Sequence, residues 1–441
     1  MSETVVRLRE WETRTPGAGP DDPLRGQTLD DAGRALAQTL RAREMLDVRE
    51  LREGIEIRSF SYVGRVRLGD LTITVAPKLD GETLLALFSY AYGLRHVERR
   101  SRVAFETDGE LLMELLIDAL HDEAEGLWAR GLPRRYRPYR EDLASPRGRI
   151  DLNALARHAV PRAVLPCEHH LRSVDWAAHR VLVAGLQLAS ATTTRPATRI
   201  RLLRLATHMA EEVSPTSLHG RGIAEALRGL DRSTRVCEPA LRLVATLHEG
   251  RALSLDETDE ADKSVTLPGF LYDMNRFFQA LLSRFLAENL ADHEVLDERA
   301  LRDLLRYAPD ANPRGRRAPR PRPDFAIRRG AQTVALLDAK YRDLWEHSLP
   351  REMLYQLALY ALSQSRGAIA TILYPVVDPA AREARVEVGD PMGGWGRAFV
   401  ALRPVAVRTL RDLIDDDSTE GRMRRRTFAW TLAFGASGSR D

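Results

Sequence analysis

The fold of this chain is decided by the stretch RPDFAIRRGAQTVALLDAKY, residues 322–341. Two runs of strand-forming residues, FAIRR and TVALLDA, lie on either side of Gly330, a residue type that favours tight turns. The second run is apolar on both faces, which is typical of a buried central strand. We therefore expect a β-hairpin that forms part of a larger sheet in an α/β domain.

Three charged residues stand where these strands reach the same edge. Asp324 precedes the first strand, and Asp338 and Lys340 end the second on one face, because strand side chains alternate. If the hairpin folds at Gly330 in the register that sets residue 324 opposite residue 338, the Cβ atoms of the two aspartates lie roughly 4.5–5.5 Å apart. Two such carboxylates can share one Mg²⁺, which also takes waters and a substrate phosphate. The pattern predicts metal ligands at Asp324 and Asp338, with Lys340 stabilising a hydroxide or phosphate during phosphodiester hydrolysis.

The lysine count supports a chemical role for Lys340. The chain has 66 basic residues, and only Lys78, Lys263 and Lys340 are lysine. Arginine would neutralise Asp338 equally well, so the surviving lysine indicates a need for a compact amine. The alternative is that Asp338 and Lys340 form an ordinary surface ion pair on an edge strand, since short D-x-K triplets are common.

Helices and strands alternate around this hairpin. Residues 271–290 and 349–364 have the pattern of helices, and residues 368–377 that of a strand. Gln356 and Tyr360 lie four residues apart on one face of the second helix, which makes Gln356 a further candidate for the catalytic site. Simple amphipathic packing is the alternative for both side chains.

The N-terminal part predicts a different architecture. Residues 14–26 are expected to form a flexible lead-in, and residues 29–46 a helix. Residues 55–79 alternate apolar and polar side chains, which predicts a small antiparallel sheet with turns at Gly64 and Gly69.

A mainly helical region is expected from about residue 82 to 250. It is followed by an acidic run, residues 256–262, that we interpret as a linker. The chain is therefore predicted to divide into an N-terminal region, 1–255, and an α/β domain, 262–441.

Two stretches are rich in arginine. Residues 126–150 hold seven arginines with interleaved aromatic residues, and residues 311–323 are rich in proline and arginine and cannot be helical. The first stretch suits a contact with nucleic acid or protein. A solvated arginine-rich loop is an equal alternative for it.

Composition excludes several classes of protein. The formal net charge is only +3, so any basic surface must be local. Two cysteines, Cys167 and Cys237, cannot build a disulfide framework, which fits a reducing, cytoplasmic location. No apolar run approaches the roughly 18 residues of a membrane span, and the N-terminus lacks a signal-peptide pattern. None of the lysines follows a glycine, so a P-loop is excluded and we expect this chain to bind no nucleotide.

Several motifs together resemble a known family. RPD at 322–324, LLDAKY at 336–341 and MLYQLALYA at 353–361 resemble the PD-(D/E)xK nuclease core of McrC, the nuclease subunit of modified-cytosine restriction systems. Further segments are similar to that family in the same order along the chain: 62–79, 131–150 and 271–282.

This resemblance implies a fold and a function. The fold is a C-terminal restriction-endonuclease-like domain, with a central mixed sheet flanked by helices, preceded by a small β domain and a helical region that docks on a partner. The function is Mg²⁺-dependent DNA cleavage in an antiviral defence system, with Asp324, Asp338, Lys340 and Gln356 at the site. The partner is a McrB-like AAA+ NTPase hexamer, usually a GTPase, whose hydrolysis the McrC-like chain stimulates.

One position departs from the family pattern. The helix that opens the nuclease domain often carries a metal-binding glutamate, and this chain has Gln279 there. A neutral amide is a weaker ligand, which puts a second metal in doubt. Two alternatives therefore stay open: a non-catalytic activator of the AAA+ partner, and a nuclease that acts alone.

Overall fold

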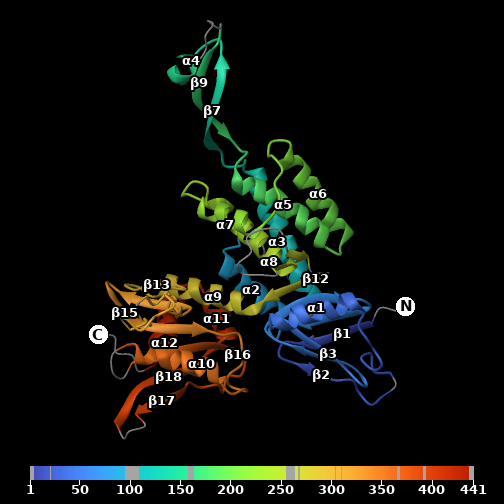
Figure 1. Ribbon diagram of the computed structural model, residues 1–441, viewed down its shortest axis with the longest axis vertical. Helices are drawn as coiled ribbons and strands as arrows, with labels where there is room; N and C mark the ends of the chain where they lie inside the picture. Colours follow the sequence, from blue (N-terminus) through green and yellow to red (C-terminus); the bar gives the residue numbers. More distant parts are fainter. Residues whose placement is uncertain are drawn as a thin grey trace.

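The computed structural model describes residues 4–436 except 20, 95–108, 157–162, 255–263, 267–268, 303, 309, 365–367 and 391–393. Two sheet-containing regions, one from each end of the chain, lie side by side (Figure 1). Helices from the middle of the chain rise above them, and a β-hairpin extends from the far end of this helical region.

The N-terminal region contains two small sheets covered by one helix. The first has the order β1-β6-β5-β12 and the second the order β2-β4-β3. Helix α1 is capped by the side chain of Asp30, which accepts a hydrogen bond from Gly33. The elements are β1 (Thr4–Arg9), β2 (Thr13–Arg14), α1 (Asp31–Ala42), β3 (Leu46–Leu51), β4 (Gly54–Ser59), β5 (Tyr62–Leu68), β6 (Leu71–Ala76) and β12 (Gly269–Asp273).

These sheets correct three sequence predictions. The region is not purely antiparallel, because β1 pairs with β6 in parallel. Gly69 is a turn as predicted, but Gly64 lies inside β5, where an added Cβ would collide with the Phe270 carbonyl of the neighbouring strand. Residues 14–26 are more than a flexible lead-in, because Leu24 is fully buried in the N-terminal core.

The expected helical region is confirmed between β6 and β12. Its helices bury apolar faces against one another in a core that continues into the C-terminal region. They are α2 (Gly81–Tyr92), α3 (Gly109–Ala129), α5 (Ala177–Thr192), α6 (Pro196–Ala210), α7 (Gly220–Arg228) and α8 (Glu238–Arg251), with a 3-10 turn at Arg235–Cys237. A further short helix, α4 (Leu152–Ala156), lies beside β9 in the projecting hairpin and buries no side chain (Figure 1).

The basic stretch 126–150 forms strands where a loop was one alternative. Strand β7 (Arg135–Leu143) pairs with β9 (Leu165–Ser173), and β8 (Arg149–Ile150) pairs with the other edge of β9. Most side chains of β7 are exposed, including Tyr136 and Tyr139. Arginine-rich strands can thus stand in solvent because both edges of the central strand are hydrogen-bonded.

A six-stranded mixed sheet forms the C-terminal region, as expected. Its order is β13-β14-β15-β16-β18-β17, and β15, β16 and β18 run parallel to one another. Helices α9 and α12 cover one face, and α10 covers the other. The elements are α9 (Met274–Asn289), β13 (Glu294–Asp297), β14 (Phe325–Arg329), β15 (Gln332–Ala339), α10 (Arg351–Leu362), β16 (Ile369–Val376), β17 (Ala384–Asp390), β18 (Gly394–Ala406), α11 (Val407–Asp415) and α12 (Thr419–Phe434).

The two sheet regions are joined by a strand exchange. The helix expected at 271–290 begins only at Met274, because residues 269–273 form β12 and pair antiparallel with β5. The acidic run at 256–262 lies outside the described residues, and short strands on either side of it pair: β10 (Ala252–Ser254) with β11 (Ser264–Thr266). Strand β12 lies after the expected domain boundary at residues 255–262, yet it completes a sheet whose other strands lie before that boundary.

Residues 311–323 contain no helix or strand, as the prolines predict. In the described part of the chain, no helix is both long and apolar enough to cross a bilayer.

Candidate nuclease site

Away from its turn, the hairpin at Gly330 has the register that the sequence prediction assumed, whereas a bulge between Ile327 and Arg328 shifts the pairing by one residue near the turn. Phe325 pairs with Leu337, and continuing this register by one residue places Asp324 opposite Asp338. Gly330 has a φ of +59°, a left-handed conformation that glycine adopts without strain. The two aspartates therefore lie at one edge of adjacent strands, on the face of the sheet that α10 covers.

The backbone fixes both carboxylates. The Asp324 N–H donates to Asp338 Oδ1 at 3.2 Å, and the Ala339 N–H donates to Asp324 Oδ2 at 2.7 Å. The Lys340 ammonium lies between them, 3.6 Å from Asp324 Oδ2 and 3.5 Å from Asp338 Oδ2. The structure thus brings together Asp324, Asp338 and Lys340.

Burial makes this cluster electrostatically unusual. Only 4% of the Asp338 side chain and 17% of the Asp324 side chain are exposed. Burial, with the charge of Asp338 as a second cause, raises the pKa of Asp324 to about 6. Burial alone would lower the pKa of Lys340, but the two carboxylates outweigh it and raise that pKa. Two buried carboxylates with one ammonium leave excess negative charge, which is the environment that a divalent cation with oxygen ligands stabilises.

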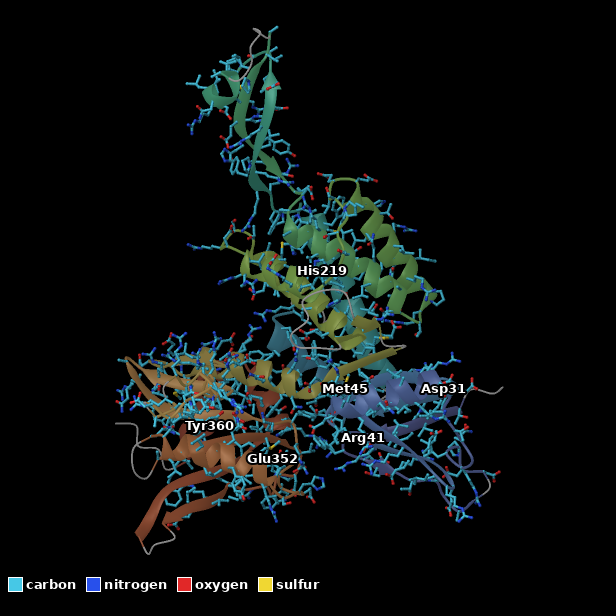
Figure 2. The ribbon with its side chains drawn as sticks, viewed as in Figure 1. Asp31, Arg41, Met45, His219, Glu352 and Tyr360 are labelled. Carbon is cyan, nitrogen blue, oxygen red and sulfur yellow. The ribbon has the colours of Figure 1, made fainter. Side chains whose placement is uncertain are left out.

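Gln356 is an exposed residue of α10 and contacts Tyr360. The Gln356 amide donates to the Tyr360 hydroxyl at 2.8 Å. Tyr360 is fully buried inside the C-terminal region (Figure 2). Burial raises its pKa, and the charges of Asp338 and Asp324 raise it further, so its hydroxyl lies within their field. The four-residue spacing of Gln356 and Tyr360 was the sequence signal for this pair, although the tyrosine was not predicted as a site residue.

Gln279 lies beside an acidic residue that the sequence prediction missed. Its amide is 3.5 Å from Glu298 Oε1, and the Glu298 N–H donates to the Asp324 carbonyl at 3.0 Å. Glu298 follows β13, a short strand that was not predicted, and has a left-handed φ of +46°. The edge of the sheet therefore carries an exposed third acid beside Asp324.

A wide, open cleft of about 1540 Å³ lies between α2, α8, α9 and α11. Gln279 and Glu298 contribute to its lining, but Asp324, Asp338 and Lys340 do not. Its arginines are mostly paired with acids, for example Arg242 with Glu238 and Arg284 with Glu288. The paired acids and the lysine therefore converge outside this cleft.

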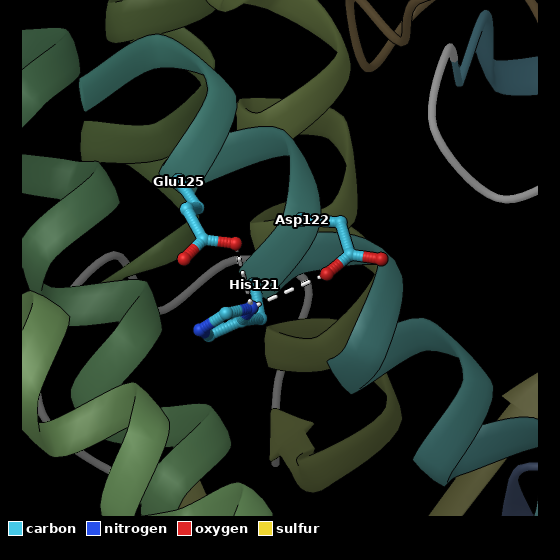
Figure 3. A group of neighbouring side chains, drawn as sticks. All are labelled: His121, Asp122 and Glu125. Atoms are coloured by element: carbon cyan, nitrogen blue, oxygen red, sulfur yellow. Dashed lines mark hydrogen bonds and ion pairs between the residues drawn. The ribbon is translucent and has the colours of Figure 1, made fainter. Parts of the chain in front are cut away.

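A second group of possible metal ligands lies on α3 (Figure 3). His121 Nδ1 is 3.3 Å from Asp122 Oδ1 and 3.9 Å from Glu125 Oε2. Because one ring nitrogen faces both acids, a hydrogen bond from this nitrogen accounts for the arrangement. No further described residue joins the group within ligand distance, so we assign it no metal.

Comparisons with known proteins agree with this fold. A family profile described as "McrBC 5-methylcytosine restriction system component" matches residues 57–375, a range that includes the hairpin and α10. No curated protein matches the chain significantly.

Two solved structures are similar to the chain. One comes from the assembly of Thermococcus gammatolerans McrB AAA+ hexamers with bound McrC, with a TM-score of 0.53 and 18% identity over 96% of this chain and 99% of that chain. The other comes from the Thermococcus gammatolerans McrBC complex, with a TM-score of 0.44 and 20% identity over 65% of this chain and 88% of that chain. The first likeness, at this identity, shows a common fold. Because the family profile covers well over half of the residues, the chain belongs to the McrBC 5-methylcytosine restriction system component family.

Proposed function

We propose that this chain is the Mg²⁺-dependent DNA endonuclease of a McrBC-like restriction system. The observation that carries the proposal is the pair of aspartates at the ends of adjacent strands, Asp338 buried and Asp324 largely so, with the Lys340 ammonium 3.5–3.6 Å from both. Paired carboxylates with a neighbouring lysine suit metal-assisted hydrolysis of a phosphodiester. The family assignment makes DNA the expected substrate.

Each residue of the cluster has a distinct part in this chemistry. Asp324 and Asp338 would hold the metal ion, which supplies a Lewis acid and a water of lowered pKa when bound. Lys340 stabilises the negative charge that develops on the phosphoryl oxygens as water attacks phosphorus and the P–O bond breaks. Gln356 would act through Tyr360, to which it donates a hydrogen bond on α10, the helix that covers this face of the sheet.

The partner in this proposal is a McrB-like AAA+ NTPase hexamer, with GTP as its expected nucleotide. Support comes from the family and from the similar chain, whose assembly is described as McrB AAA+ hexamers with bound McrC. The exposed hairpin of β7 and β9 is the surface we assign to the ring or to DNA. Arginine contacts with phosphates would add affinity without base recognition.

Reconstitution tests the proposal. The chain is mixed with its AAA+ partner, GTP, Mg²⁺ and DNA containing 5-methylcytosine, and cleavage is followed on gels. Wild-type protein should cut, and Asp338→Asn should bind the partner without cutting. Equal cutting by Asp338→Asn and wild type would place the active site elsewhere.

A non-catalytic activator is the second candidate, and one observation favours it. The neutral Gln279 stands on the opening helix beside Glu298, where the family often has a metal-binding acid. This candidate expects faster NTP hydrolysis by the partner but no cleavage by wild-type chain at any Mg²⁺ concentration. Cutting in the absence of partner and nucleotide would instead identify a nuclease that acts alone.

A further inference from the structure

Tyr341, the residue after Lys340, is held by residues from distant parts of the chain. Its N–H donates to Asn275 Oδ1 of α9 at 2.9 Å. Its carbonyl accepts a hydrogen bond of 3.2 Å from the Trp11 indole N–H, which comes from the segment between β1 and β2. Its ring is buried against Phe278 in a T-shaped contact. Side chains thus hold both the backbone N–H and the backbone carbonyl of Tyr341.

The residues that hold Tyr341 are themselves fixed by the N-terminal sheets. The backbone N–H of Trp11 donates to the Phe60 carbonyl at 3.3 Å. The Trp11 and Phe60 rings pack edge to face, with their centres 6.0 Å apart. The Arg342 guanidinium lies 5.1 Å from the Trp11 ring centre, which adds a cation–π contact. Asn275 also donates to Ser61 Oγ at 2.7 Å. The N-terminal sheets therefore contact the end of the catalytic strand through defined hydrogen bonds.

Trp11 has an uncommon backbone conformation. Its φ is +60°, the left-handed region that residues with a side chain seldom adopt. Such a conformation costs free energy and persists only where surrounding contacts enforce it. The neighbouring Glu10 is only 2% exposed, and neither of its carboxyl oxygens makes a well-formed hydrogen bond. Burial raises the pKa of Glu10 to about 8, against the opposing charge of Lys78.

Lys340 lies directly before the residue that these hydrogen bonds hold. Its backbone N–H donates to the Leu373 carbonyl at 3.0 Å, which fixes the peptide on the β16 side. The strand ends at Ala339, so the peptide between Lys340 and Tyr341 has no strand partner, although its carbonyl accepts a hydrogen bond of 2.9 Å from the Arg342 N–H. A lysine side chain has a flexible four-carbon stem, and fixing its backbone on both sides reduces the conformations open to the ammonium.

We propose that Trp11 and Asn275 are positioning residues for Lys340, which they act on by clamping the peptide groups of Tyr341. The inference rests on the proposed function, because it assigns the purpose of the clamp to the nuclease reaction. Under this proposal the N-terminal region, through Trp11, supports the site that residues 322–341 form.

The scarcity of lysine provides a direct test. Protein labelled with ¹³C-lysine gives signals from only Lys78, Lys263 and Lys340, and a Lys340→Arg spectrum assigns the third. Trp11→Phe keeps an aromatic ring but removes the indole N–H. Its matched control is Trp176→Phe, since the Trp176 indole donates an equivalent hydrogen bond of 3.1 Å to the Pro133 carbonyl, at the base of the hairpin.

The Lys340 signal should shift or broaden in Trp11→Phe and stay unchanged in Trp176→Phe. Single-turnover cleavage by Trp11→Phe with partner, nucleotide and Mg²⁺ should fall about tenfold, a barrier increase of about 1.4 kcal/mol. The Kd for DNA should stay within about twofold, because arginines carry that affinity. Tyr341→Phe keeps the clamped peptide and should retain the wild-type Lys340 signal.

Two results would overturn the inference: an unchanged Lys340 signal in Trp11→Phe, or equal loss of cleavage in both tryptophan variants. If Trp11→Phe does not fold, Asn275→Ala removes the clamp from the other side and is judged by the same criteria. Failure of the proposed function is distinguishable, because wild-type protein would then not cut DNA while the lysine spectra still decide whether the clamp positions Lys340.

Discussion

Lys340 is the residue whose chemistry the structure constrains most closely. Its ammonium lies 3.5–3.6 Å from two carboxylates, in a chain that uses arginine at almost every other basic position. A guanidinium there would pair with both acids but is larger and planar, so it cannot occupy the same point beside the phosphate. We expect Lys340→Arg and Lys340→Ala to slow single-turnover cleavage similarly, by about a hundredfold or about 3 kcal/mol.

Lys78→Arg is the matched control for this substitution, because Lys78 is exposed and lies outside the cluster. Its cleavage rate should equal that of wild type. Near wild-type cutting by Lys340→Arg would mean that the lysine only neutralises its acidic neighbours.

Asp324 makes stability depend on pH. Its pKa is raised from 3.8 to about 6 in the folded protein, so folding favours the protonated carboxyl. The protonated Asp324 carboxyl therefore stabilises the folded protein fully below its unfolded-state pKa, near pH 4. This stabilisation is lost as the pH rises through 6. At pH 7.5 without metal, Asp324→Asn should therefore be more stable than wild type, by up to about 3 kcal/mol.

Thermal unfolding measures this effect. The Tm difference between Asp324→Asn and wild type should disappear only below about pH 4, and added Mg²⁺ should stabilise wild type only. Asp21→Asn, at an exposed site, should match wild type throughout. A less stable Asp324→Asn protein at pH 7.5 would show that its contacts with Lys340 and Ala339 outweigh the burial of charge.

At the scale of elements, β12 is the strand that connects the two sheet regions. It pairs with β5 and buries Phe270, Leu271 and Tyr272 almost completely. Each such side chain contributes roughly 1.5–3 kcal/mol on burial. A fragment of residues 1–255 lacks β12 and leaves one edge of β5 open, whereas a fragment of residues 1–273 keeps it.

We therefore expect fragment 1–273 to unfold at a higher temperature than fragment 1–255 and to aggregate less. Under the proposed function, 1–273 should co-elute with the AAA+ partner and raise its NTPase rate without cutting DNA. Equal melting temperatures would mean that β12 adds little to the N-terminal region. If the full chain co-elutes with the partner and fragment 1–273 does not, the docking surface lies beyond residue 273.

The elements also explain how far the sequence could lead. The hairpin itself followed from the sequence because both strands are local, and alternation put Asp338 and Lys340 on one face. The register that sets Asp324 opposite Asp338 was only a condition, and the bulge between Ile327 and Arg328 that produces it was not predicted. Strand β12 could not be predicted, since its apolar run continues into the helical pattern of α9 and its partner lies some 200 residues away. Glu298 was missed because β13 has only four residues. Trp11 was missed because nothing in its own segment indicates a contact with Tyr341, 330 residues later.

At the scale of the whole molecule, the hairpin of β7 and β9 projects away from the carboxylate cluster, so that under the proposed function partner contact and chemistry lie apart (Figure 1). Strands β7 and β9 pair from Arg135↔Ser173 to Leu143↔Leu165, far from the nuclease hairpin in Figure 1. Contacts with the helical region occur at the base, where Arg135 pairs with Asp231 at 2.6 Å and lies over the Trp176 ring. Because Arg135 and Ser173 are paired neighbours, a short Gly-Ser turn can replace residues 136–172 without moving the helices.

The hairpin deletion should leave folding and the Lys340 environment intact, because the deleted residues contribute little to the main core. Under the proposed function it should abolish stimulation of the partner NTPase, and with it the cleavage that depends on nucleotide. Replacing the exposed Arg137 and Arg140 by Gln, in an otherwise complete hairpin, separates charge from shape. If both variants lose stimulation, the arginines make the contact; if only the deletion does, the shape of the hairpin makes it. Full stimulation by the deletion variant would show that the ring docks elsewhere, and the NTPase rate at saturating chain concentration is the measurement that decides.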